Sequence, residues 1–283
     1  MTNLLSDAKK TPLSHVIIVT LFGIGLSSIP LDALLKLIIP DEYIAKTLGM
    51  TLTRLIFGVV AIYFIYKYGF LKNMFKKPTH IGLVMTLPAL LVVVNNFPII
   101  GVINGNVKVV GETPRIILYV IYCLSVGIYE ETIFRGLVFP LCLIKTEKTK
   151  HPTFWAIALS SGIFGVAHLL NLLGGASIPA TLLQVGYSFL IGGMCAISLC
   201  LTDNLIVPII LHFIYDVGGL FVGQYGVGMG NQWDNATVII TAILGTIVLI
   251  YMIIVVFFIK PKPTNLIEML KLDDTNKKQG ERA

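Results

Sequence analysis

Long apolar stretches, separated by short polar segments, follow one another along nearly the whole chain. Because a helix needs about 20 mainly apolar residues to cross a bilayer, this pattern predicts an all-α protein, a polytopic transmembrane helical bundle. The first stretch is expected to break near Pro30. About eight spans are predicted, at residues 14–39, 47–69, 81–103, 115–144, 153–173, 179–202, 205–222 and 237–259.

The composition supports this interpretation. The chain is 55% hydrophobic and 13% charged, whereas soluble domains carry about 25% charged residues. Since no segment between the spans is long enough to fold alone, we expect one membrane-embedded domain over residues 1–260. Its motif-bearing core is expected at 115–222, and residues 261–283 are expected to form a polar cytoplasmic tail.

The basic residues predict the orientation of the bundle. With the amino terminus inside, the segments facing the cytoplasm hold most of the lysines. These are Lys9, Lys10, Lys67, Lys72, Lys76, Lys77, Lys145, Lys148, Lys150, Lys260, Lys262, Lys271, Lys277 and Lys278, together with Arg282. The opposite side receives Lys36, Lys46, Arg54, Lys108 and Arg115. Both termini are therefore predicted to be cytoplasmic, and the net charge of +6 reflects topology. Because the lysines are dispersed, no nucleic-acid partner is expected.

Three segments outside the spans carry weaker signals. The loop 104–114 is expected to form a short hairpin on the outer face, and the glycines at 223, 226, 228 and 230 a flexible outer loop. Residues Asn265–Leu272 are expected to form a short amphipathic helix on the membrane surface.

The four cysteines fall within predicted spans without a C-x-x-C pair, so no disulfide or cysteine metal site is expected.

The fourth span contains three charged residues within six positions, Glu130, Glu131 and Arg135. Each charge near a bilayer centre costs roughly 2.5–3.5 kcal/mol on insertion scales. Glu131 and Arg135 are four residues apart and share one helix face, which predicts an ion pair. Glu130 points about 100° away from Glu131 and is free to act on something else. The alternative is a purely structural charge cluster that joins helices.

Two later spans carry further ionisable groups. His168 lies in the fifth span, and His212 and Asp216 share a face of the seventh. Counted at about 1.5 Å per residue from the cytoplasmic ends, Glu130 and His168 reach similar depths, about 20 Å. These four side chains are expected to surround one water-filled pocket. Histidines and carboxylates placed together suit the activation of water by a general base, with or without a metal.

Several known chemistries are excluded by missing motifs. The chain has no His-Glu-x-x-His, no Gly-x-Ser-x-Gly and no second intramembrane aspartate in a Gly-x-Gly-Asp context. Two alternatives to hydrolysis stay open. One is a non-proteolytic membrane immunity or scaffold protein, and the other is a proton-coupled transporter.

Three motifs occur in order on these spans: Glu-Glu-x-x-x-Arg (Glu130, Glu131, Arg135), Phe-x-x-x-His (Phe164, His168) and His-x-x-x-Asn/Asp (His212, Asp216). Together they resemble the CPBP family of CAAX proteases and bacteriocin-processing enzymes, also called Abi or type II CAAX-prenyl endopeptidases. The resemblance covers about residues 115–220. It implies an intramembrane endopeptidase of a family classed as metalloproteases.

The resemblance also implies roles for the motif residues. Glu130 and His168 would position and activate the attacking water, and His212 and Asp216 would stabilise the oxyanion or help hold the site. Glu131, Arg135 and Phe164 would support its geometry. Members of the family often have asparagine where this chain has Asp216, and a carboxylate there would repel an oxyanion unless it were protonated or paired with His212.

Cofactor and partners follow from the same reasoning. A metal-free site is favoured, with zinc as the alternative, held by Glu130, His168 and His212. The expected partners are the lipid bilayer and a membrane-associated peptide or protein substrate. The resemblance and the lysine- and isoleucine-rich composition favour a multi-pass protein of a bacterial plasma membrane, acting in peptide maturation or bacteriocin immunity.

Overall fold

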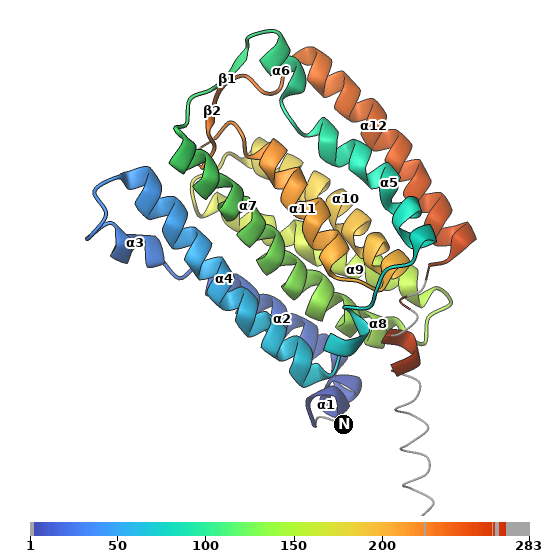
Figure 1. Ribbon diagram of the computed structural model, residues 1–283. Helices are drawn as coiled ribbons and strands as arrows, with labels where there is room; N and C mark the ends of the chain where they lie inside the picture. Colours follow the sequence, from blue (N-terminus) through green and yellow to red (C-terminus); the bar gives the residue numbers. More distant parts are fainter. Residues whose placement is uncertain (1–2, 224, 262, 264–265, 270–283) are drawn as a thin grey trace, which may run out of the picture.

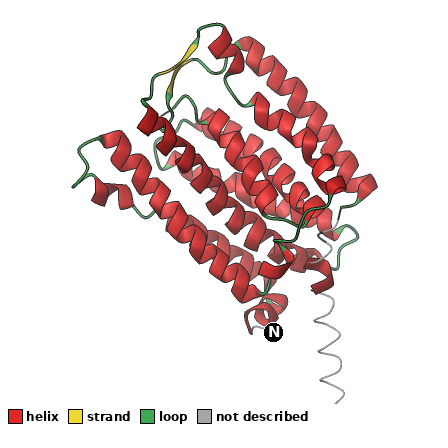
Figure 2. Ribbon diagram, viewed as in Figure 1, coloured by secondary structure: helices red, strands yellow, loops and turns green. Residues whose placement is uncertain are grey.

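The computed structural model describes residues 3–223, 225–261, 263 and 266–269. The described chain is a bundle of helices with one small pair of strands at one end (Figures 1 and 2). Its helices are α1 (Asn3–Lys10), α2 (Pro12–Ser27), α3 (Leu31–Leu35), α4 (Glu42–Tyr68), α5 (His80–Asn95), α6 (Ile99–Ile103), α7 (Thr113–Ile133), α8 (Phe139–Thr146), α9 (Pro152–Ala167), α10 (Ile178–Thr202), α11 (Ile206–Gly219) and α12 (Asn235–Ile254). The shorter elements are the 3₁₀ turns η1 (Leu71–Asn73) and η3 (His168–Leu172), the π turns η2 (Phe134–Val138) and η4 (Val255–Ile259), and the strands β1 (Val107–Val109) and β2 (Gly228–Gly230). The predicted all-α helical bundle is confirmed.

Six helical segments of the described chain are long and apolar enough to cross a membrane: Pro12–Leu35, Glu42–Tyr68, Thr113–Thr146, Pro152–Leu172, Ile178–Thr202 and Asn235–Ile259. The other two predicted spans are shorter than expected. The stretch 81–103 is divided at Pro98 into α5 and α6, and the stretch 205–222 forms only α11. Both differences arise where proline or glycine ends the helix. The expected break near Pro30 is confirmed, because α2 ends at Ser27 and α3 begins at Leu31.

The helix α7 occupies the centre of the bundle, between α4 on one side and α11 on the other (Figure 1). In the span Thr113–Thr146, 56% of the most apolar stretch is buried inside the protein, against 11% in the span that contains α12. Gly127 permits the close approach of α11, because a Cβ at this position would lie 3.0 Å from the carbonyl oxygen of Ile209. The charged motif of α7 therefore lies in a well-enclosed part of the protein.

The span that begins with α7 is not a continuous α-helix. Directly after Ile133 it makes a π turn, η2, which contains Arg135 and in which the N–H of Phe139 bonds to the carbonyl of Phe134, five residues earlier. Pro140 explains the change, since it lacks an N–H and its ring clashes with the carbonyl four residues before it, that of Gly136. Turns of this kind are frequent at functional sites.

Loop contacts fix α11 at both of its ends. At its start, the N–H of Leu205 donates to the carbonyl of Met74 (2.7 Å), and Asn204 Nδ2 donates to the carbonyl of Lys76 (2.6 Å). At its end, backbone carbonyls that lack partners within a helix accept from other elements. Tyr119 Oη donates to Val217 (2.8 Å), and Gln232 Nε2 donates to Gly218 (2.9 Å). The helix that carries His212 is therefore held in register against α7.

The two loops at the far end of the bundle pair with each other. β1 and β2 are antiparallel, with Lys108 opposite Met229 (Figure 2). The predicted hairpin within 104–114 is therefore wrong: the partner strand comes from the glycine-rich loop after α11, two of whose glycines, Gly228 and Gly230, lie in β2. Gly230 has a φ of 132°, a conformation that only glycine adopts easily.

Most of the expected surface helix Asn265–Leu272 lies outside the described residues. Only its residues 266–269 are described. These four residues are helical, and Leu266 is buried among the core residues beside α1 and α8.

Candidate active site

The motif residues of α7, α9 and α11 converge on one buried polar cluster, which is centred on His212. Its members are Glu130, Glu131, Arg135, Phe164, His168, His212 and Asp216. All seven were predicted from the sequence as site residues, and the structure brings them together from three separate helices.

Glu131 is the point at which the charged motif and the last histidine meet. Its Oε1 accepts from Arg135 Nη1 at 2.9 Å and from His212 Nδ1 at 2.6 Å. The Glu131 side chain is 0% exposed and that of Arg135 is 1% exposed. The predicted ion pair between Glu131 and Arg135 is confirmed. His212 joins this pair as a third residue, which helical spacing alone did not indicate. A shared, fully buried oxygen of this kind fixes both of its partners.

Arg135 is fitted into a compact space. Its guanidinium lies over the ring of Phe164, 4.6 Å from the ring centre, a favourable cation–π geometry. Gly192 on α10 makes room for it, because a Cβ there would lie 2.9 Å from Arg135 Nη2. Arg135 Nε and Nη2 and Glu131 Oε2 have no hydrogen-bond partner among the described residues.

Phe164 connects the two histidines. Its ring meets His168 edge-on with centres 5.0 Å apart, and meets His212 edge-on with centres 5.9 Å apart. Its carbonyl accepts from His168 Nδ1 at 2.9 Å. A carbonyl can only accept, so Nδ1 of His168 carries the proton, and Nε2 of the neutral ring keeps a lone pair.

The remaining nitrogen of His212 lies between two further carboxylates. Nε2 is 3.7 Å from Glu130 Oε2 and 3.6 Å from Asp216 Oδ2. Glu130 is the most accessible carboxylate of the cluster, with a side chain 23% exposed against 13% for Asp216. The two neighbouring glutamates therefore differ in environment: Glu131 is sealed among charged partners, whereas Glu130 borders the accessible side of the cluster.

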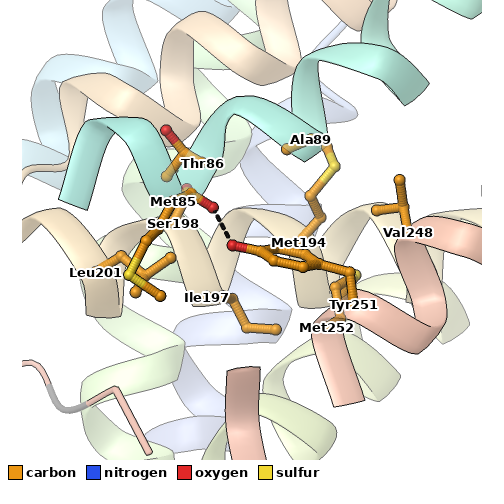
Figure 3. Close-up of a pocket in the computed structure, with 10 residues that line it drawn as sticks. All are labelled: Met85, Thr86, Ala89, Met194, Ile197, Ser198, Leu201, Val248, Tyr251 and Met252. Carbon is orange, nitrogen blue, oxygen red and sulfur yellow. Dashed lines mark hydrogen bonds between the residues drawn. The ribbon is translucent and has the colours of Figure 1, made fainter. Parts of the chain in front are cut away.

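Two hollows lie elsewhere between the helices and the cluster side chains line neither of them, so the expected water-filled pocket stays a prediction. A small cavity of about 10 Å³ lies between α5, α10 and α12, where Tyr251 Oη donates to the carbonyl of Met85 at 2.5 Å (Figure 3). A larger open groove of about 630 Å³ lies between α9 and α10, and it is lined by Gly165 and Tyr187 among others. Gly165 directly follows Phe164, so this groove runs beside the cluster.

A metal ion does not fit the cluster as it is arranged. In the part of the chain that the structure describes, no group of three histidine, cysteine, aspartate or glutamate side chains is placed to hold one. Glu130, His168 and His212 therefore do not form the ligand set considered as the alternative. Each histidine directs Nδ1 to a protein oxygen.

Two features of the site were missed by the sequence reasoning. One is the π turn η2. The sequence indicated it through Pro140, which cannot donate a hydrogen bond to the carbonyl of Gly136, four residues earlier. The other is Arg54, assigned from the sequence to the outer side. It lies in the middle of α4, and its guanidinium lies 5.1 Å from the centre of the Tyr122 ring of α7. A lone arginine within an apolar span was the signal for it.

Residues 112–218 match the family model described as type II CAAX prenyl endopeptidase Rce1-like. The motif-bearing segment is therefore similar to this family. The resemblance inferred from the three motifs is thus confirmed, and all seven cluster residues lie inside the matched Rce1-like segment. No curated protein and no solved structure matches the chain. Residues 1–111 and 219–283, which include α4 and Arg54, lie outside the match.

Proposed function

We propose that this protein hydrolyses a peptide bond in a membrane-associated peptide or protein, with Glu130 and His168 activating the water. The observation that supports the proposal most strongly is the different surroundings of the two adjacent glutamates. Glu131 is bound to Arg135 and His212 and is fully enclosed, whereas Glu130 is partly exposed and, among the described residues, has only the 3.7 Å contact with His212 as an ion pair. An accessible carboxylate beside a histidine lone pair is suited to take a proton from water.

In the proposed reaction, the carboxylate of Glu130 accepts a proton from a water molecule that also donates to Nε2 of His168. The water oxygen attacks the carbonyl carbon of the scissile bond and forms a tetrahedral oxyanion. The bond between this carbon and the amide nitrogen then breaks, and Glu130 returns the proton to the leaving nitrogen. One water is consumed, and the products are a carboxylic acid and an amine.

His212 is assigned to the oxyanion. Its Nδ1 is committed to Glu131, and a proton on Nε2 can be donated to the developing charge. Asp216 lies one turn further along α11 and is 3.6 Å from the same nitrogen. We therefore assign Asp216 to positioning His212, and not to contact with the oxyanion, which a carboxylate would repel.

We further propose that the substrates are membrane-associated peptides processed in a bacterial plasma membrane, in peptide maturation or bacteriocin immunity. The family's description names prenylated CAAX peptides, so a prenylated peptide is a reasonable first probe. Nothing in the cluster itself requires a prenyl group. A mixture of hydrophobic peptides without one is the matched second probe.

The test uses the full-length protein in phosphatidylcholine–phosphatidylglycerol vesicles, with cleavage of both probes detected by mass spectrometry. Glu130→Ala and His168→Ala are expected to insert and fold normally and to release no product. Glu112→Ala and His151→Ala, which change the same residue types outside the cluster, are expected to cleave like the wild type. Full cleavage by both site variants would overturn the proposal. Binding of a probe without any product would favour a non-proteolytic immunity or scaffold protein.

A further inference from the structure

Asn96 caps the end of α5 and is buried against the end of α11 that carries Asp216. Its Nδ2 donates to the carbonyl of Tyr215 at 2.7 Å. Since a carbonyl can only accept, the amide nitrogen and not the amide oxygen must face it. Tyr215 directly precedes Asp216 in the chain. A side chain at the end of α5 therefore holds the backbone of α11 next to a residue of the cluster.

Two successive glycines let Asn96 approach α11 so closely. A Cβ on Gly218 would lie 2.7 Å from the carbonyl carbon of Asn96, and a Cβ on Gly219 would overlap its side-chain amide. Gln232, which is also buried, donates from Nε2 to the carbonyls of Asn96 and Gly218, at 2.9 Å each. Buried amides are costly unless they are hydrogen-bonded. These bonds therefore fix the position of α11 relative to the end of α5.

The position of this end of α11 sets the surroundings of His212. Asp216 Oδ2 lies 3.6 Å from His212 Nε2, and the two residues are one turn apart on a helix of only 14 residues. A shift at the end of α11 therefore reaches His212 within one turn. Groups that act on a transition state must be held to within about 0.5 Å of the productive geometry.

We propose that Asn96 is a positioning residue for the hydrolysis: through the carbonyl of Tyr215 it sets the place of Asp216, and so of His212 Nε2. This inference rests on the proposed function of the cluster. Asn96 lies outside the matched segment 112–218, so a residue from the amino-terminal part of the chain contributes to the rate. Because His212 is assigned to the oxyanion, which forms only during the reaction, the effect belongs in kcat and not in KM.

Asn95 provides a matched control directly beside Asn96. Its Nδ2 donates to Thr241 Oγ1 of α12 at 2.7 Å, the same length as the bond from Asn96 to Tyr215. The two neighbouring asparagines thus tie the end of α5 to different helices. Of these two helices, only α11 carries residues of the cluster. A general loss of helix packing should affect both variants, whereas a loss of positioning should affect only that of Asn96.

The experiment measures cleavage of the probe peptides in vesicles and the melting temperature for Asn96→Ala and Asn95→Ala. Both variants lose one side-chain hydrogen bond of the same length, so similar falls in melting temperature are expected. A displacement of about 1 Å can cost about 100-fold, but Tyr119 and Gln232 still hold α11 in Asn96→Ala. We therefore expect a kcat about tenfold below that of the wild type, with KM unchanged. Asn95→Ala should keep the kcat of the wild type.

The nitrogen chemical shifts of His212 provide a readout that does not depend on cleavage. Protein labelled with ¹⁵N-histidine is compared as wild type, Asn96→Ala and Asn95→Ala, with His212→Gln to assign the signals. Because Asp216 faces Nε2, its displacement should shift the Nε2 signal in Asn96→Ala. Asn95→Ala should keep the signal of the wild type. Asn96→Ser, whose side chain is too short to reach the carbonyl of Tyr215, should behave as Asn96→Ala does.

The inference is overturned if Asn96→Ala and Asn95→Ala have the same kcat, or if the Nε2 signal of His212 is unchanged in Asn96→Ala. It is also overturned if neither Asn96 variant folds while Asn95→Ala does, since Asn96 is then required for folding and not for positioning. Its failure differs from failure of the proposed function. In the first case Glu130→Ala still abolishes cleavage, and in the second Glu130→Ala continues to cleave.

Discussion

Nδ1 of His212 lies 2.6 Å from Oε1 of Glu131, and this contact joins the motif of α7 to the motif of α11. It commits one ring nitrogen of His212 and directs the other toward Glu130 and Asp216. Because Arg135 shares the same oxygen, one glutamate holds both a supporting cation and a residue assigned to catalysis.

The first prediction concerns this shared glutamate. Glu131→Gln leaves the buried guanidinium of Arg135 without its counter-charge, and breaking a buried pair typically costs about 3–5 kcal/mol. We expect a large fall in the melting temperature of the detergent-solubilised protein, together with loss of cleavage. A variant as stable as the wild type would show that Glu131 does not hold the cluster together.

The second prediction concerns the tautomer of His168. Since Nδ1 donates to the carbonyl of Phe164, the neutral ring should carry its proton on Nδ1 and present an unprotonated Nε2. Nitrogen chemical shifts of protein labelled with ¹⁵N-histidine can test this at a pH where the ring is neutral, with His168→Gln to assign the signal. A proton found on Nε2 would contradict the proposed role of His168 in orienting water.

The third prediction concerns the close approach of α7 and α11. In Gly127→Val, the Cβ would lie 3.0 Å from the carbonyl oxygen of Ile209 and 3.1 Å from the nitrogen of Phe213, so α11 must shift. Displacement of a catalytic group by about 1 Å can reduce a rate by about 100-fold. We expect kcat to fall by about this factor. Gly245→Ala on α12 is the control, because a Cβ there meets nothing within 4 Å. Equal activity of the two variants would argue against a need for His212 in its observed position.

The fourth prediction concerns Asp41, which caps α4. The N–H of Ile44 at 3.0 Å and the guanidinium of Arg115 at 2.7 Å hold the pKa of Asp41 below its ordinary 3.8. A lowered pKa in the folded state adds stability above the unfolded pKa, and this stability is lost as the pH falls through the folded value. Asp41→Asn keeps the cap but removes the charge. Its melting temperature should lie below that of the wild type at neutral pH and approach it well below pH 3.8.

Asp234→Asn is the matched control for this experiment. Asp234 caps α12 through the N–H of Thr237 at 2.8 Å, and no ion pair of Asp234 is found among the described residues. Its replacement therefore removes a capping charge without breaking an ion pair of the kind that Asp41 makes with Arg115. If the difference for Asp41→Asn stayed constant down to strongly acidic pH, the charge of Asp41 would not contribute.

The helical pattern was predictable from the sequence, because it depends on local periodicity. Apolar stretches indicated the spans, and the four-residue spacing of Glu131 and Arg135 indicated their pair. The bond from Glu131 to His212 was not predictable, since it depends on how closely α7 and α11 pack at Gly127. The β1–β2 pairing likewise joins segments more than 100 residues apart, for which local spacing gives no signal.

The isosteric variant Glu130→Gln tests most directly whether Glu130 acts as the base while Glu131 holds the cluster together. Cleavage of the probe peptides in vesicles and the melting temperature are measured on the same preparation, beside the wild type. The Glu130 side chain is partly exposed and lies outside the Arg135–Glu131–His212 chain of hydrogen bonds, so the variant should remain as stable as the wild type. Because the variant lacks the proposed base, it should release no product. Cleavage at the rate of the wild type by stably folded Glu130→Gln would contradict the assignment of Glu130 as the base.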